Sequence, residues 1–197
     1  MIFKHTLTEH VKQGDSTSLC KGHVRIFNCY KNDNQKNLLV DTNNHIVISG
    51  RHWLMQRMFG MPYDIEDQKQ EWSPSWFSVG DGGASIDTPF QPIWPTDDDV
   101  TLFNRLQFNA TGGPRYTLDK YYKLVDGISF VAALTAKVTM TVDYADCASH
   151  YINEAGLFVA PSQAQDETNF GLFSHVTFPT IPKSDLVKLI IEWYFIF

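Results

Sequence analysis

The chain has 197 residues, of which 43% are hydrophobic and 14% aromatic, enough for one domain with a sizeable core. Its net charge of −6 argues against binding a nucleic-acid backbone, which requires clustered Lys and Arg. No stretch approaches the roughly 20 apolar residues that cross a bilayer, so no membrane partner is expected. Only 19% of residues are charged, which indicates that partners cover much of the surface. Three cysteines without a CxxC pair favour free thiols over a disulfide framework.

The N-terminal part of the chain is polar and mixed, and we expect residues 1–43 to form an extension or arm. Within it, residues 21–30 (KGHVRIFNCY) fit a short strand, and the polar residues 30–37 predict a loop. Residues 49–60 are the best helix candidate, because Ser49 can cap the N-terminus and apolar residues follow at helical spacing. The start of the chain lacks the apolar core of a signal peptide, so we expect synthesis in the cytoplasm.

A glycine-rich turn follows the first clearly apolar strand, in WFSVGDGG at residues 76–83. It is a weak phosphate-binding motif, since no Lys-Ser/Thr follows, and a turn that needs positive φ explains it better. Residues 84–101 contain three prolines and predict a long ordered loop. Asp97, Asp98 and Asp99 could gather Ca²⁺ together with Asp87, but they lack the alternating spacing of a calcium loop. A solvated loop is the favoured interpretation.

The strongest periodicity lies between residues 128 and 144, where every even position is apolar. This alternation predicts a β-strand. At about 3.3 Å per residue it would span roughly 55 Å, so we expect it to bend at a bulge or to project beyond the domain. Residues 152–160 and 170–178 predict the two strands of a hairpin, and Pro179 and Pro182 are expected to break the sheet after it.

The last predicted strand, residues 186–197, has a uniformly apolar set of odd positions that should face the core: Val187, Leu189, Ile191, Trp193, Phe195 and Phe197. Its even positions are mixed, and three of them are candidates for a subunit interface: Ile190, Tyr194 and Ile196. Together the elements predict a mainly β protein. We expect a single antiparallel β-sandwich domain at residues 44–197, with one short α-helix near residues 49–60 and long loops.

Residues that could carry chemistry do not form a recognised catalytic set. There is no GxSxG elbow and no His/Cys spacing of a zinc site. Asp143, Asp146 and Glu154 could form the carboxylate pair of a glycoside hydrolase, although carboxylates at sheet ends are commonly just solvated. We therefore expect no enzymatic activity, no catalytic or metal-binding residues and no cofactor. The aromatic side chains of Trp72, Trp76 and Trp94 would suit stacking on sugar rings.

Four segments resemble, in their order, structural proteins from the neck, baseplate and fibre-attachment regions of tailed bacteriophages: NHIVISGRHWLMQRMFG, WFSVGDGGASIDTP, YINEAGLFVA and FGLFSHVTFPTIPKSDLVKLIIEWYFIF. In that family a Gly-Arg/Lys pair opens a short helix, a strand ends in VGDGG, EAGLF follows, and a lysine-containing turn leads into an aliphatic last strand. The residues at the matching places are Gly50, Arg51, Val79, Gly80, Asp81, Gly82, Glu154, Gly156, Leu157, Phe158 and Lys183. The resemblance covers about two thirds of the chain, from Asn44 onward with gaps.

The resemblance implies a non-enzymatic virion protein, made in the host bacterial cytoplasm, that forms a homo-oligomeric ring or docks on one. Its partners would be other tail, neck, baseplate or fibre subunits, and we expect an adaptor in the neck or baseplate. The alternative is a carbohydrate-binding or receptor-binding module of the tail, and a hydrolase is a third interpretation. Residues 1–43 fall outside the resemblance, and the chain ends where a fibre shaft would otherwise begin.

Overall fold

In the computed structural model, residues 20–58, 72–109, 116–161, 164, 166–168 and 170–197 are described. This part contains a curled, nine-stranded antiparallel sheet, a half-barrel in shape, with strand order β4-β3-β7-β8-β2-β1-β9-β6-β5. The strands are β1 Lys21–Tyr30, β2 Asp33–Ile46, β3 Trp72–Gly80, β4 Lys123–Leu124, β5 Gly127–Ala132, β6 Thr135–Val142, β7 His150–Pro161, β8 Gly171–Lys183 and β9 Val187–Ile196. Helix α2 spans Ile48–Met58 and the single turn α3 spans Tyr116–Asp119. Neither is long and apolar enough to cross a membrane.

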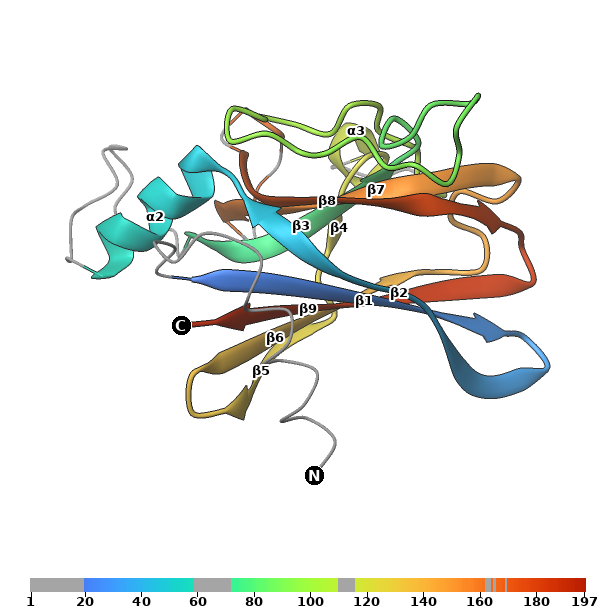
Figure 1. Cartoon of the computed structure of the whole chain (residues 1–197), viewed down its shortest axis with the longest axis horizontal. Coiled ribbons are helices and arrows are strands. Elements are labelled where there is room, and N and C mark those ends of the chain that lie inside the picture. Colours follow the sequence, from blue (N-terminus) through green and yellow to red (C-terminus); the bar gives the residue numbers. More distant parts are fainter. Residues whose placement is uncertain (1–19, 59–71, 110–115, 162–163, 165, 169) are drawn as a thin grey trace.

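The sheet curls at β2, the strand that its two halves share. Residues 33–44 of β2 pair with β1, whereas only His45 and Ile46 pair with β8. In Figure 1, β3, β7 and β8 therefore lie above β1, β9 and β6. The mainly β fold with one short helix is confirmed. That the two facing halves amount to a β-sandwich stays a prediction.

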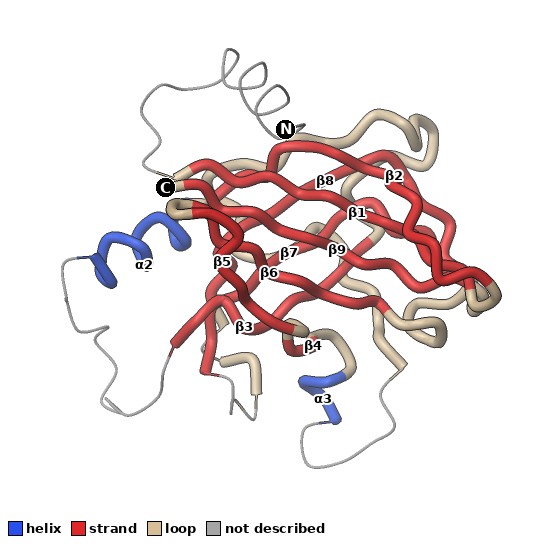
Figure 2. The backbone as a smooth tube through the Cα atoms, turned by 90° about the horizontal axis from the view of Figure 1, so that it is seen from below, coloured by secondary structure: helices blue, strands red, loops and turns tan. Residues whose placement is uncertain are grey.

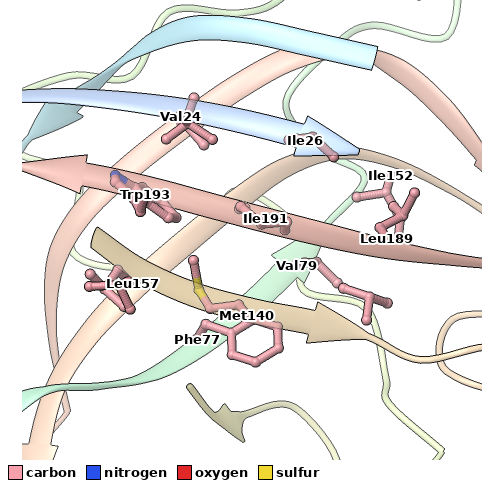
Figure 3. Packing of buried hydrophobic residues seen from close by; sticks show 14 of the residues in the cluster. Val24, Ile26, Phe77, Val79, Met140, Ile152, Leu157, Leu189, Ile191 and Trp193 are labelled. Atoms are coloured by element: carbon pink, nitrogen blue, oxygen red, sulfur yellow. The ribbon is translucent and has the colours of Figure 1, made fainter. Parts of the chain in front are cut away.

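The main core fills the inside of the curl. Alternate residues of a strand point to the same face, so each strand of the two halves directs its apolar residues into the core. Figure 3 shows such residues from β1, β9 and β6 together with residues of β3 and β7. Burial of each such side chain contributes about 1.5–3 kcal/mol. The fully buried members labelled there are Val24, Ile26, Phe77, Val79, Met140, Ile152, Leu157, Leu189, Ile191 and Trp193.

A second apolar cluster covers the other face of β3, β7 and β8. Its members Tyr122 and Phe158 pack edge to face, with their ring centroids 5.1 Å apart. Trp76 and Leu172 lie in the same cluster. Because β7 is buried on both faces, residues 152–160 are all buried, which explains why residues 155–160 form a continuous run without polar side chains rather than an alternating one.

Strand β9 confirms the predicted alternation and lies inside the sheet. Its odd positions from Val187 to Phe195 are buried, and its even positions are half-buried. The prediction was wrong for Phe197, which is 51% exposed, because β9 ends at Ile196. In Figure 2, β1 and β6 flank β9, so both of its edges are hydrogen-bonded within the chain.

The long periodic segment between residues 128 and 144 is a hairpin, not one bent or projecting strand. β5 and β6 pair with each other and turn at Ala133 and Leu134. The predicted core positions of β6, Val138, Met140 and Val142, are buried. Those of β5 are exposed, because β5 lies at the rim of the sheet, beyond the core.

The folded domain begins earlier than the predicted boundary at residue 44. Residues 21–43 form β1 and most of β2 rather than an arm, and the turn between these strands is shorter than the predicted loop at 30–37. Alternating burial in β1 and its pairing with β9 hold these residues in the sheet. Residues 1–19 of the predicted arm lie outside the described residues.

Two local predictions were also wrong. Helix α2 begins at Ile48, and the Ser49 hydroxyl donates to the carbonyl oxygen of Leu172, at 2.5 Å, instead of capping the helix. Strand β8 continues through Pro179 and Pro182 to Lys183. β2 pairs only with Ser174 and His175 of β8. Pro179 lies in the register shift between β7 and β8, where it has no assigned partner, whereas Pro182 is paired with Tyr151 of β7.

Candidate functional site

A long loop, residues 81–109, carries most of the large apolar side chains that the described residues expose outside the sheet. Figure 1 shows it, in green, over β7 and β8. Ile86 is 93% exposed, Trp94 80% and Phe90 78%. Large exposed apolar side chains that gather on one loop are a candidate interaction site. We call these residues the apolar loop surface: Ile86, Phe90, Ile93, Trp94, Val100 and Phe103.

Backbone hydrogen bonds hold the apolar part of the long loop in one conformation. The Ile93 N–H donates to the Gly83 carbonyl at 2.8 Å and closes the loop on itself. The Thr177 hydroxyl donates to the Ile93 carbonyl at 2.7 Å, and the Thr180 N–H donates to the Pro89 carbonyl at 2.9 Å. Both threonines belong to β8, so the sheet positions the loop.

The Glu154 carboxylate, on β7, fixes both ends of the long loop. Oε1 accepts hydrogen bonds from the N–H groups of Gly82, at 3.0 Å, and Asn104, at 2.8 Å. Oε2 accepts one from the N–H of Phe103 at 2.9 Å. Glu154 has no exposed surface, and charge-assisted bonds of this kind are about twice as strong as neutral ones.

The fourth partner of Glu154 is the fully buried His175 of β8. Its Nε2 lies 3.0 Å from Glu154 Oε2, and its Nδ1 lies 2.8 Å from Asp99 Oδ2. Both nitrogens can donate at once only when the imidazole carries two protons. Burial acts to raise the pKa of Asp99, but hydrogen bonds from Thr96 and His175 outweigh it and the pKa is lowered. We call Asp99, His175 and Glu154 the buried charge network.

The geometry of the buried charge network suits a brace between the sheet and the loop. A general acid or base must reach a reacting atom, whereas Glu154 and His175 have no exposed surface and face partners of their own chain. Buried charges are stable where paired and hydrogen-bonded, and removing one partner is strongly destabilising. The network can therefore fix the loop firmly.

Helix α2 is tied to the same loop through Asp97. The Asp97 carboxylate contacts Arg51 and, at 2.5 Å, His45, and its carbonyl accepts the Ile48 N–H. The hydrogen bond from Arg51, followed by that from His45, lowers the pKa of Asp97. Asp98 is exposed. The described residues contain no group of three or more His, Cys, Asp or Glu placed to hold a metal ion.

Most of the family-motif residues meet around Glu154 or pack in the cores. A Cβ on Gly80 would lie 2.3 Å from the Asn104 carbonyl oxygen, and one on Gly82 would lie 2.6 Å from Phe103 Cβ, so only glycine allows this approach. Asp81 accepts a hydrogen bond from the Asn104 side chain at 2.5 Å. Val79, Leu157 and Phe158 are buried. A Cβ on Gly50 would lie 2.1 Å from the Phe173 carbonyl oxygen, and one on Gly156 would lie 2.8 Å from Leu102 Cδ2.

Lys183, the last motif residue, belongs to a separate buried site. Its Nζ donates to the carbonyl oxygens of Tyr144 and Ser184, each at 2.9 Å, and burial lowers its pKa. Asp146, which follows Tyr144 closely in the sequence, accepts hydrogen bonds from Lys123 Nζ at 2.7 Å and from the Asp143 N–H at 2.8 Å. The carboxylates considered for hydrolysis thus hold different partners: Glu154 clamps the long loop, Asp146 is paired with Lys123, and the side chain of Asp143 is exposed.

The tryptophans considered for sugar stacking do not form a row. Trp76 is fully buried in the second cluster, because it lies on the covered face of β3. The side chain of Trp72 lies outside the described residues. Trp94 remains available, on the apolar loop surface.

The candidate interface residues Ile190, Tyr194 and Ile196 lie half-buried on the outer face of β9. The Tyr194 hydroxyl donates to Glu192 at 2.6 Å, and burial together with Glu192 raises the pKa of Tyr194 to about 12. Arg25 of β1 lies over the Tyr194 ring. A subunit contact on this largely polar face stays a prediction.

The sequence offered no signal for the buried charge network, because Asp99, Glu154 and His175 are far apart in the chain. Comparison with protein-family models, with curated proteins and with solved structures gives no match for this chain.

Proposed function

We propose that this chain is a non-enzymatic structural protein of a tailed phage virion, an adaptor in the neck or baseplate that anchors tail or fibre proteins. The observation that carries the proposal is the apolar loop surface on a firmly braced loop. A braced loop suits an adaptor, because its main chain is already ordered and loses little further conformational freedom on binding. The resemblance to tailed-phage structural proteins is the basis for proposing a phage neck or baseplate as the assembly.

The bracing contacts support this function. The fully buried Glu154 and His175 hold the long loop to β7 and β8, and Asp97 ties it to α2. Phe90 and Trp94 stay largely exposed although the main chain at Pro89 and Ile93 is bonded to β8. Large aromatic side chains are the typical energetic anchors of protein interfaces. The brace thus presents anchors at fixed positions.

Three further statements belong to the proposal. The two facing halves of the curled sheet serve as a β-sandwich scaffold. Ile190, Tyr194 and Ile196 supply a second, more polar contact with a neighbouring subunit of a ring. The subunit is made in the bacterial cytoplasm and is then incorporated into the virion. It uses no cofactor and does not bind nucleic acid specifically.

The test is incorporation into particles. Virions from the phage genome that encodes the chain are purified, and the copy number of the chain is measured by mass spectrometry and located in a density map. The double variant Phe90→Ser, Trp94→Ser should fold normally, because exposed substitutions usually change stability by less than about 0.5 kcal/mol. We expect it to be lost from particles.

The matched control is Leu186→Ser, which removes an apolar side chain that is 57% exposed but lies outside the long loop. It should be incorporated like the wild type. Purified particles without the chain would overturn the virion role. Normal incorporation of the double variant would overturn the role of the apolar loop surface.

A carbohydrate-binding or receptor-binding module is the second candidate, favoured by the 80% exposure of Trp94. In that case the isolated chain should bind on a glycan array, and Trp94→Ala should abolish the signal while Leu186→Ala retains it. Absence of any glycan signal, together with the particle results above, would exclude it.

A further inference from the structure

Strand β5 forms one edge of the sheet in the part of the chain that the structure describes. It ends the strand order and, among the described strands, pairs with β6 alone. All of its residues, Gly127–Ala132, are exposed, including Phe130 at 84% and Val131 at 49%. Unpaired N–H and C=O groups along such an edge can accept another strand. Figure 1 shows β5 at the lower rim of the sheet.

This edge lacks the protection that sheets usually show. Proteins protect edges with short strands or charged residues. The opposite edge fits this rule, since β4 has two residues and contains Lys123, which bonds to Asp146. In contrast, the sequence from Gly127 to Ala136 has no charged residue.

The apolar inner face of the sheet continues onto β5. Ile128 pairs with the buried Val138, and Phe130 pairs with Ala136, so the two β5 side chains extend the core face past the end of the core. At the tip of the β5–β6 hairpin, the carbonyl oxygen of the exposed Leu134 accepts a hydrogen bond from the N–H of Phe197, which is 51% exposed. Among the described residues, the outer side of β5 therefore has backbone groups without a strand partner, next to an apolar face.

We propose that β5 pairs with β5 of a second copy of this chain across a two-fold axis, which joins two nine-stranded sheets into one. A two-fold axis that relates two copies of one strand makes them antiparallel, as every pair in this sheet already is. Because β4 is too short to receive a six-residue strand, head-to-tail extension of the sheet is disfavoured. The chain carries a net charge of −6, and the uncharged β5 is where two copies meet without close like charges.

Pairing centred on Ser129 gives the best side-chain match. It sets Ile128 of one copy opposite Phe130 of the other, twice by symmetry, and the two copies of Ser129 opposite each other. Apolar cross-strand pairs of this kind stabilise a sheet. The contact is small, so the isolated dimer is weak and neighbouring contacts would strengthen it in an assembly.

The experiment uses the purified full chain and does not depend on the virion role. Sedimentation equilibrium up to roughly 1 mM, where weak pairing of a small interface is detectable, should show a reversible dimer. Phe130→Lys should abolish it while leaving the melting curve unchanged, because the side chain is exposed. The control Leu186→Lys should dimerise like the wild type.

A crosslink tests the register independently. The three native cysteines are buried, and burial raises the pKa of Cys20 to about 11 and that of Cys147 to about 12, so they react slowly. Ser129→Cys should form an intermolecular disulfide under mild oxidation, whereas Ser184→Cys, an exposed position in the turn between β8 and β9, should not. A wild-type chain that stays monomeric throughout, as expected if the edge takes a strand of another protein instead, overturns the proposal. So does a dimer that survives Phe130→Lys or crosslinks equally at both positions.

Discussion

Replacing Glu154 with Gln tests whether the buried carboxylate braces the long loop. Gln has nearly the same shape, but one carboxylate oxygen becomes an NH₂ group. If that group replaces Oε2, it faces the N–H of Phe103, donor against donor; if it replaces Oε1, it faces the N–H groups of Gly82 and Asn104. At least one backbone donor therefore loses its acceptor.

The cost follows from these contacts. One unsatisfied donor costs about 1–3 kcal/mol. The remaining bonds lose charge assistance, which is about half of their strength. We expect Glu154→Gln to lower the free energy of unfolding by about 3 kcal/mol, a large part of the roughly 5–15 kcal/mol typical of a domain. For a domain of this size the melting temperature should fall by about 6–12 °C.

Urea unfolding measures the loss of stability, and amide hydrogen exchange shows where it occurs. Exchange should accelerate at Gly82, Phe103 and Asn104. The matched control is Asp98→Asn, the same kind of change at an exposed carboxylate of the same loop, which should cost less than about 0.5 kcal/mol. A loss below about 1 kcal/mol with unchanged exchange at these amides would refute the role of Glu154 as a brace.

Gly83→Ala should cost about 2 kcal/mol or more, because the new Cβ would lie 2.3 Å from the Asn153 carbonyl oxygen, while Gly171→Ala, with no atom within 4 Å, should be nearly neutral. Equal melting temperatures for the two variants would contradict the close approach. Trp193→Ala should cost about 3–5 kcal/mol in urea unfolding. Trp193→Phe should cost much less, because the indole Nε1–H has no hydrogen-bond partner in the described part of the chain. Burial acts against ionisation of Asp146, but the hydrogen bonds from Lys123 and the backbone lower its pKa. Its stabilisation should therefore be present above the unfolded pKa of about 3.9 and be lost as the pH falls through the lower folded value, and Asp146→Asn should flatten this part of the pH profile.

Alternation made β9 readable from the sequence, because one face of that strand is buried and the other is not. The same rule failed between residues 128 and 144. There the apolar period of two runs on through the turn at Ala133 and Leu134, and no glycine or proline marks the reversal. The sequence could not show that β5 lies beyond the core, since Ile128 and Phe130 are as apolar as the buried residues of β6.

The start of the domain was missed for a related reason. β2 is largely exposed and rich in Asn and Asp, so its sequence resembles that of a loop, and only its pairing with β1 identifies it as a strand. The buried charge network could not be predicted from the sequence either. His175 was one of several scattered histidines, and its partners Asp99 and Glu154 approach it only when the long loop folds back over β7 and β8.

The place of β9 between β1 and β6 also sets the order in which the sheet can form. On a ribosome, β1 and β6 emerge well before the strand that must join them, and each has a bare side until β9 is available. Contacts between segments so distant in the chain form slowly. A nascent chain that stalls before β9 would therefore leave one edge of β1 and one edge of β6 unpaired and prone to aggregation.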